Sequence, residues 1–467
     1  MASSTMTLST SLGKIRGIVR DDCRVFLGVP FAHAGRFEYA VPTERLSDGP
    51  EAVFDATKPG PGCPQNRAVH EHLEHATRNF YKKEYREGDT FTYDEDCLNV
   101  NIFTPLGAED PTRKFPVIVF FYGGGFDSGL NNENTFDGAG FARRGVVTVF
   151  ANYRVGVLGY FTHEEIRRRT GRDGNFGLDD QLTALRWTKA HIADFCGDPE
   201  NITVMGQSAG AISTQYLCLM PENKGLFQHA VMMSGGGMFP KFALPKHAED
   251  SHEYWLAFMK DAGCESFEDF KAAPLEKLFD AVEQIRTERK DHTYNTMPVI
   301  DGVLLPRPID EMIRTPLPID YMLGYSNTDL YAPIMAYIGN RFGKQNGAYI
   351  YFFDLDSPGD DNKAFHSADL RYMFETFDRS WRPYGARDLE AGRELASYVA
   401  NFARTGDPNG EGLTDGPAGE SSALPRWLPA AKHDAKVLRI AADGTAMGYA
   451  HYFPLAVNFL KHPEPKA

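Results

Sequence analysis

The stretch Gly206-Gln207-Ser208-Ala209-Gly210 decides how the rest of this sequence is interpreted. The five residues before it, 201–205, are short, β-branched and apolar, which is typical of a buried strand. Residues 211–220 after it have the pattern of a helix that ends at Pro221. A G-x-S-x-G sequence between a strand and a helix is typical of a nucleophile elbow, a tight turn that exposes the serine hydroxyl. Ser208 is therefore the candidate nucleophile, and an ordinary strand-to-helix turn is the less favoured interpretation.

Composition limits the possible partners of the chain. Its 467 residues are 42% hydrophobic and 24% charged, as in a soluble globular protein. The 63 acidic and 49 basic residues give a net charge of −14, which argues against nucleic acid or an anionic membrane as partner, because both require clustered Lys and Arg. No run of 18 apolar residues is present, so no membrane span is expected. The first residues lack the features of a secretory signal, and a cytoplasmic location is expected.

Apolar strands alternate with amphipathic helices along the chain. This alternation predicts an α/β fold with a mostly parallel sheet covered by helices on both faces. No internal repeat and no domain boundary is visible, so a single domain is expected over residues 1–467. Apart from the segments around Ser208, strands are predicted at 116–121, 146–151, 319–323 and 349–353, and helices at 178–192 and 389–402.

A serine hydroxyl is a weak nucleophile at neutral pH and needs a base and a group that orients the base. In α/β-hydrolases these groups follow in the order Ser, Asp or Glu, His. Among the histidines after Ser208, only His366 lies in a loop directly after a strong strand. Asp329 follows the preceding strand, whereas Asp320 lies inside that strand and Asp301 in a turn. His366 is therefore the predicted base and Asp329 the predicted acid, with a loop-capping carboxylate as the alternative for Asp329.

A glycine run follows the predicted strand 116–121. The sequence Tyr122–Phe126 contains three consecutive glycines and is of the HGGG type, which exposes backbone N–H groups to a substrate. Such donors stabilise the negative charge that develops on a carbonyl oxygen during acyl transfer. The predicted oxyanion hole consists of the N–H groups of Gly124, Gly125 and Ala209, and a flexible turn is the alternative interpretation.

With these residues the chain resembles the type B carboxylesterases, the cholinesterase-like family of α/β-hydrolases. The resemblance implies an α/β-hydrolase fold with a large, mostly parallel central sheet. It also implies hydrolysis of a small-molecule carboxylic ester without a cofactor, with His366 as base and the same oxyanion donors. The other segments that carry it are Phe26–Ala32, Asp94–Asn101, Asn152–Arg154, Gly174–Leu178, Ala184–Trp187, Phe195–Pro199, Pro298–Gly302 and Phe365–Leu370.

Several residues depart from the family pattern. Asp329 stands where the family usually has Glu, and its shorter side chain requires the loop to come closer. The segment that follows is shorter than in animal members, which predicts a more open gorge. Gln207 stands where cholinesterases have Glu, and no Trp lies between Cys63 and Cys97, where they carry a cation-binding indole. A neutral amide holds a quaternary ammonium less well than a carboxylate does, so neutral esters are expected rather than choline esters.

The resemblance also implies structural roles. Arg36 and Glu95 match a buried ion pair, and Cys63 and Cys97 match a disulfide whose thiols could stay reduced in this chain. Asp179 replaces an apolar residue of a family helix, and nothing in the sequence explains it.

The substrate pocket is the least defined part of the prediction. Gln207 and two aromatic residues after Ser234–Gly237, Phe239 and Phe242, are its candidates. The spacing of His70, His72 and His75 is too weak a pattern for a metal site, and no metal is expected.

Two alternative functions remain open at the level of sequence. A binding protein that has lost catalysis is disfavoured by the presence of Ser208 and the glycines. The same chemistry on an amide, a carbamate or a long-chain lipid ester is the other alternative, although no extended apolar lid is visible. The sequence does not predict the oligomeric state.

Overall fold

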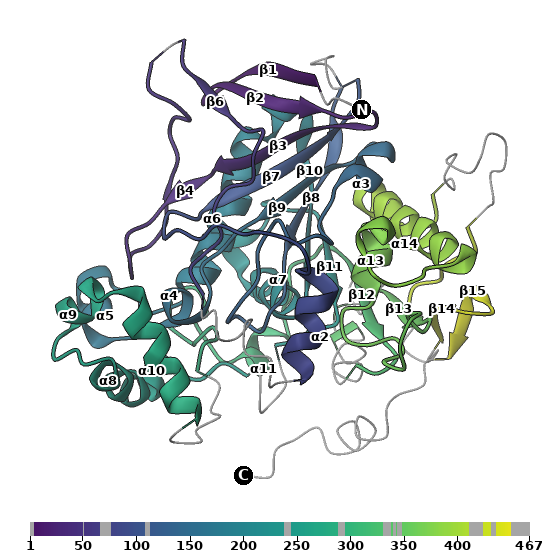
Figure 1. The fold of residues 1–467 in the computed structure, drawn as a ribbon. Helices are drawn as coiled ribbons and strands as arrows, with labels where there is room; N and C mark the ends of the chain where they lie inside the picture. Colours follow the sequence, from purple (N-terminus) through teal and green to yellow (C-terminus); the bar gives the residue numbers. More distant parts are fainter. Residues whose placement is uncertain are drawn as a thin grey trace.

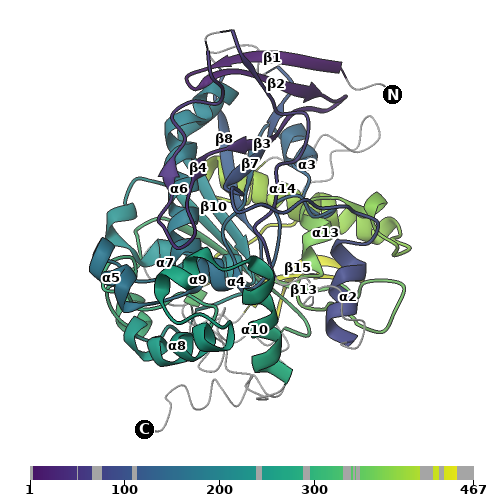
Figure 2. The same cartoon turned by 60° about the vertical axis from the view of Figure 1, so that its left-hand side comes forward.

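A computed structural model of the chain shows one large sheet with helices on both faces (Figures 1 and 2). The structure describes residues 4–49, 51–65, 76–107, 113–237, 244–287, 295–329, 338–339, 342, 348–410, 424–430 and 436–449.

Thirteen strands of the described ranges form the sheet, in the order β1-β2-β3-β7-β9-β8-β10-β11-β12-β13-β14-β15, with β6 paired to β2. All neighbours from β9 to β14 are parallel, whereas β1, β2, β3, β7 and β15 are attached antiparallel at the two sides. The bounds are β1 (Ser4–Thr10), β2 (Gly13–Val19), β3 (Cys23–Pro30), β6 (Val53–Asp55), β7 (Asn99–Pro105), β8 (Phe115–Phe121), β9 (Val147–Ala151), β10 (Gly197–Gln207), β11 (His229–Met233), β12 (Asp320–Ser326), β13 (Tyr349–Asp354), β14 (Lys436–Ala441) and β15 (Gly444–Tyr449), and β4 (Ala32–His33) pairs separately with β5 (Val41–Pro42).

The helices cover both faces of this sheet. In Figures 1 and 2, α6 lies on one side of the central strands, and α3 and α14 lie on the other. Helices α5, α8, α9 and α10 gather beside the sheet, at the lower left of Figure 1. The bounds are α2 (Ala76–Tyr85), α3 (Ala139–Arg143), α4 (Gly156–Tyr160), α5 (Glu164–Thr170), α6 (Phe176–His191), α7 (Ala209–Leu219), α8 (His252–Asp261), α9 (Phe267–Ala272), α10 (Leu275–Thr287), α11 (Ile309–Met312), α13 (Asp369–Met373) and α14 (Ala386–Thr405).

The predicted elements are present, with shifted ends. The strands predicted from apolar runs correspond to β8, β9, β10, β12 and β13, and the helices to α6, α7 and α14. Strands β8, β9 and β11 are buried along their whole length, as expected for parallel strands covered on both faces. Helix α14 ends at Thr405, and the φ of 76° at the next residue, Gly406, favours glycine at that position.

Helix α6 is buried on more than its predicted apolar face, because two aspartates on it have arginine partners. Asp180 is fully buried and accepts a hydrogen bond from Arg154, with Oδ1 and Nη2 2.7 Å apart. Asp179 lies 2.7 Å from Nη1 of Arg172, and its other oxygen accepts from the backbone N–H of Ala40 at 3.3 Å. The unexplained Asp179 is therefore an ion-pair partner that connects α6 to the chain before it.

Two expectations from the family resemblance concern structural pairs. The Arg36–Glu95 ion pair is present, with Nε and Oε2 2.7 Å apart, although Glu95 remains partly exposed. Cys63 and Cys97 are free, buried thiols. A hydrogen bond with Cys63 and burial both raise the pKa of the Cys97 thiol well above its ordinary value, which keeps it protonated.

None of the helices in the described parts of the chain combines the length and hydrophobicity that crossing a bilayer requires. The prediction of a single domain over residues 1–467 stays a prediction.

Candidate active site

Ser208 lies in a tight turn between β10 and α7, the strand–turn–helix arrangement predicted from the sequence. Its φ of 54° and ψ of −121° are a conformation that non-glycine residues rarely adopt. The two glycines of the motif are required by space. A Cβ on Gly206 would lie 2.2 Å from the carbonyl oxygen of Gly210, and one on Gly210 would lie 2.0 Å from that of Phe121. The N–H of Ser208 donates to the carbonyl of Met233 at 2.8 Å, which fixes the turn to β11.

The three predicted triad residues meet at the carboxyl end of the parallel sheet. Ser208 follows β10, Asp329 follows β12, and His366 follows β13, so parallel pairing brings the three loops to one edge. His366 Nε2 lies 2.9 Å from Ser208 Oγ, and His366 Nδ1 lies 3.3 Å from Asp329 Oδ2. Asp329 is 1% exposed, whereas the His366 side chain keeps 28% of its surface exposed. The arrangement therefore has a buried acid, a base in contact with it, and a hydroxyl within reach of the base.

Charges around His366 favour its protonated form. Burial alone would lower the pKa of the imidazole, but the attraction of Asp329, its hydrogen bond and the charge of Asp369 outweigh burial and raise the pKa above its ordinary 6.5. Asp369 is fully buried, and its carboxylate accepts a hydrogen bond from the Tyr351 hydroxyl at 2.7 Å. Burial, reinforced by the charge of Asp329, raises the pKa of Asp369 to about 6. A second carboxyl group thus acts on the histidine.

The glycine run after β8 passes directly against Ser208. A Cβ on Gly123 would lie 2.8 Å from the Cβ of Ser208. Gly124 and Gly125 have φ of 111° and 63°, which L-residues with side chains adopt only with strain. Ala209 is the first residue of α7, and the first N–H groups of a helix have no partner within it. Gly123 and Ala209 therefore adjoin the serine, and Gly124 and Gly125 continue the run from Gly123. The assignment of Gly124, Gly125 and Ala209 as oxyanion donors stays a prediction.

Comparison with known proteins identifies the family. The model of the carboxylesterase family matches residues 4–344 and 330–454. The chain belongs to the carboxylesterase family. This carboxylesterase is therefore a carboxylic ester hydrolase, and both the predicted enzyme class and the predicted α/β-hydrolase fold are confirmed.

The similar proteins cover most of the carboxylesterase chain. It is 28% identical over 474 residues to a para-nitrobenzyl esterase of Bacillus subtilis strain 168, which covers 87% of the chain and 91% of that relative. It is 28% identical over 508 residues to carboxylesterase 5A of Canis lupus familiaris, over 89% of the chain and 84% of the relative. The solved structure of a thermophilic PNB esterase has a TM-score of 0.76 at 24% identity, over 95% of this chain and 97% of that chain.

The remaining predicted residues of the carboxylesterase differ in how the structure places them. Gln207 ends β10, is 3% exposed, and its Nε2 lies 3.4 Å from His366 Nε2. Phe239 and Phe242 lie outside the described residues, so the acyl pocket stays a prediction.

No metal centre is found in the part of the carboxylesterase that the structure describes. Within it, no group of three or more His, Cys, Asp or Glu side chains is arranged to hold a metal ion. His70, His72 and His75 lie outside the described residues.

Sequence reasoning missed three residues of the carboxylesterase that act on the site. Asp369 stands in the motif around His366, but nothing in the motif indicates that its side chain is buried and that its charge acts on the imidazole. Tyr81 and Tyr85 of α2 donate to the backbone that carries the histidine. Only their spacing of four residues, which places both on one face of a helix, was available in the sequence.

Proposed function

We propose that this carboxylesterase hydrolyses neutral carboxylic esters through an acyl-enzyme on Ser208. The observation that carries the proposal is the 2.9 Å contact between His366 Nε2 and Ser208 Oγ, with Asp329 on the opposite ring nitrogen. A base in this position removes the hydroxyl proton as the oxygen attacks.

The reaction follows from these contacts in two halves. Ser208 Oγ attacks the ester carbonyl carbon while its proton passes to His366 Nε2, and the imidazolium is stabilised by Asp329. The N–H groups of Gly124, Gly125 and Ala209 donate to the oxyanion of the tetrahedral intermediate. His366 then protonates the leaving alkoxide oxygen, and the alcohol departs. Water repeats the sequence on the acyl-enzyme, which releases the acid and restores Ser208.

The preference for neutral esters rests on Gln207. Its side chain is uncharged, buried and within 3.4 Å of the imidazole, so it supplies no negative charge to a quaternary ammonium. The similarity to a para-nitrobenzyl esterase also favours an uncharged ester as substrate.

The test is hydrolysis of p-nitrophenyl esters from acetate to palmitate by the wild type and by Ser208→Ala. The wild type is expected to turn over at least the short esters, and the variant to lose a factor of about 10⁶ in kcat, as when a triad serine is removed. A wild type that shows no turnover above that of the variant on any chain length would contradict the proposal. A rapid burst of p-nitrophenol equal to the enzyme concentration would report the acyl-enzyme directly.

A further inference from the structure

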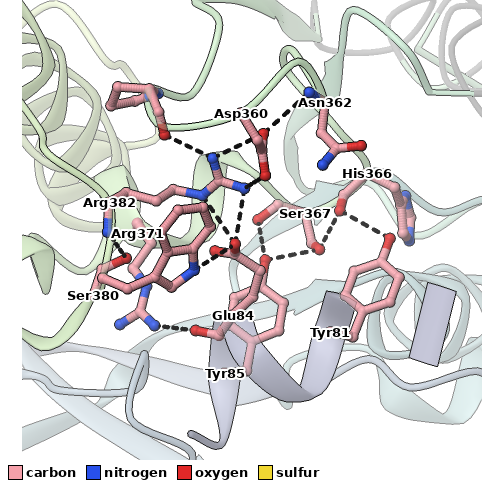
Figure 3. A network of polar contacts seen from close by, with 12 residues as sticks. Tyr81, Glu84, Tyr85, Asp360, Asn362, His366, Ser367, Arg371, Ser380 and Arg382 are labelled. Carbon is pink, nitrogen blue, oxygen red and sulfur yellow. Dashed lines mark hydrogen bonds and ion pairs between the residues drawn. The ribbon is translucent and has the colours of Figure 1, made fainter. Parts of the chain in front are cut away.

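The last turns of α2 face the backbone of the segment that carries His366 (Figure 3). We call residues 355–368, between β13 and α13, the histidine loop. The Tyr81 hydroxyl donates to the carbonyl of His366 at 3.3 Å. The Tyr85 hydroxyl lies 2.9 Å from both the carbonyl oxygen and Oγ of Ser367. The two tyrosine rings stack with centroids 6.1 Å apart, and their hydroxyls contact two consecutive residues of the loop.

The part of the histidine loop that they hold is in a conformation the chain itself disfavours. Ser367 has a φ of 74°, in the left-handed region that costs a non-glycine residue about 1–3 kcal/mol. Its own hydroxyl donates to the carbonyl of His366. Such a conformation persists only where surrounding contacts determine it. Because Ser367 directly follows the histidine, these contacts also fix the direction in which the imidazole leaves the backbone.

Helix α2 is itself tied to the chain on either side of His366. Glu84 is 1% exposed, and its Oε1 accepts from Arg382 Nε at 2.9 Å and from Trp381 Nε1 at 3.0 Å. Arg382 also pairs with Asp360 in the histidine loop, with Nη2 and Oδ2 2.8 Å apart. Arg371 donates to the backbone carbonyl of Glu84. The helix therefore reaches the loop through a set of charged contacts, and Figure 3 shows those of Glu84 and Asp360 with Arg382.

The two hydroxyls remain donors across the working pH range. Burial, reinforced by the charge of Asp329, raises the pKa of Tyr81 above its ordinary value. Burial likewise raises the pKa of Tyr85. Neither phenol loses its proton under conditions in which a serine esterase works.

We propose that Tyr81 and Tyr85 are positioning residues that hold His366 in line between Ser208 and Asp329. Neither tyrosine reaches the reacting atoms, and both act through the backbone of the histidine loop. The proposal rests on the proposed function, in which His366 is the base. It predicts an effect on kcat rather than on KM, because the contacts fix the base and not the substrate.

The test compares Tyr81→Phe, Tyr85→Phe and the double variant with Tyr321→Phe as a matched control. Tyr321 is also buried, and its hydroxyl donates to the carbonyl of Leu317 at 2.6 Å, at the end of β12 away from the site. The rate of p-nitrophenyl acetate hydrolysis is divided by the concentration of active sites, which is measured by titration with an organophosphate.

The expected result separates positioning from stability. The double variant should lose about tenfold or more in kcat with KM within about twofold, since small displacements of a catalytic group have effects of this size. The pKa of the acid limb of kcat/KM should fall, because an imidazole that moves away from Asp329 and Asp369 loses their attraction. The control should lower the melting temperature similarly and leave kcat and the pH profile unchanged.

Two results would contradict the positioning role of the tyrosines. A double variant with kcat per titrated site within twofold of wild type, or a control that loses as much, overturns the positioning role. If Tyr85→Phe does not fold, Tyr81→Phe decides alone, because its hydroxyl contacts the histidine's own carbonyl from a partly exposed position. Wild-type turnover by Ser208→Ala would instead overturn the proposed function, whereas an inactive Ser208→Ala beside a fully active double variant overturns only the positioning.

Discussion

Ser208 and His366 lie 2.9 Å apart, yet the chain holds them by different means. Ser208, the proposed nucleophile, is held by backbone: two glycines of the motif pass so close to neighbouring carbonyls that no side chain fits. His366, the proposed base, is held by side chains, because hydroxyls, carboxylates and an arginine fix the loop around it. We call the turn around Ser208 the serine half of the site and the loop around His366 the histidine half. The geometry of the serine half should be disturbed by substitutions that add atoms, and that of the histidine half by substitutions that remove hydrogen-bonding groups.

After removal of the proposed nucleophile itself, the largest expected effect is on the histidine half. Asp329→Asn should lower kcat by about 10⁴ for two reasons. The amide favours the wrong tautomer of the imidazole, and it does not stabilise the positive charge of the imidazolium. Steady-state kinetics on p-nitrophenyl acetate measures the loss, and an unchanged circular dichroism spectrum shows that the fold is intact. Near-wild-type kcat would transfer the role of the acid to another carboxyl group, with Asp369 the first to examine.

The serine half should fail when a single carbon is added. In Gly210→Ala the new Cβ would lie 2.0 Å from the Phe121 carbonyl oxygen, and backbone atoms cannot move away cheaply. Loss of about 1–3 kcal/mol in the free energy of unfolding is expected, with kcat reduced about 10²-fold in the folded fraction. Gly385→Ala is the control, since its nearest neighbour is 3.8 Å away. Equal stability of the two variants would show that the elbow is not held by close backbone contacts.

The pH dependence of activity should show whether the charge of Asp369 contributes to the raised pKa of His366. In the proposed mechanism the neutral imidazole is the base, so activity should fall on acidification with a pKa above 6.5. In Asp369→Asn this limb should move to lower pH, because one of the two attracting carboxylates is gone. An unmoved limb in the kcat/KM profile would exclude Asp369 as a contributor.

The same variant should be more stable at neutral pH. The folded-state pKa of Asp369 is about 6, above its ordinary 3.8, so the folded state binds more protons between these values and stability falls as pH rises through them. Asp369→Asn removes this loss, on the order of 1–3 kcal/mol at pH 7, while the Tyr351 hydroxyl keeps an acceptor. Thermal unfolding at pH 4 and pH 7 measures the difference, and a variant no more stable than wild type at pH 7 would contradict it.

The smallest effect is expected from Gln207→Glu, which adds a charge where the two halves meet. A carboxylate beside the imidazole should raise the pKa of His366 and attract a quaternary ammonium by about 0.5–1 kcal/mol. The ratio of kcat/KM for acetylthiocholine to that for p-nitrophenyl acetate should rise about two- to fivefold at a pH above the acid limb. An unchanged ratio would show that Gln207 does not determine the proposed preference for neutral esters.

The serine half could be predicted from sequence because its determinants are local. Glycine spacing and the apolar runs of β8 and β10 lie next to the residues that they position. Strand β7 was missed for a physical reason: its Asn99 and Asn101 are buried, with side chains bonded to backbone carbonyls, so the strand lacks a continuous apolar run.

The histidine half was only partly predictable. Ser208, Asp329 and His366 were chosen by the order that triad residues follow in α/β-hydrolases, and the structure brings the three together. The hydroxyl of Tyr85, however, meets the histidine loop across 282 residues of sequence. Neither composition nor periodicity indicates which buried hydroxyl will face a distant carbonyl, because such contacts depend on the completed fold.

The pairing of β11 with β12 has a consequence for the segment that joins them. The two strands are adjacent and in parallel register from His229 and Asp320 onward, although α8, α9, α10 and α11 all lie between them in the chain. The two strands thus pair without any contribution from these helices to the sheet. The helices contact the N-terminal part of the chain instead, for example where Arg36 Nη1 donates to the carbonyl of Lys271. The parallel register of β11 and β12 therefore does not require the intervening helices to contribute a strand to the sheet.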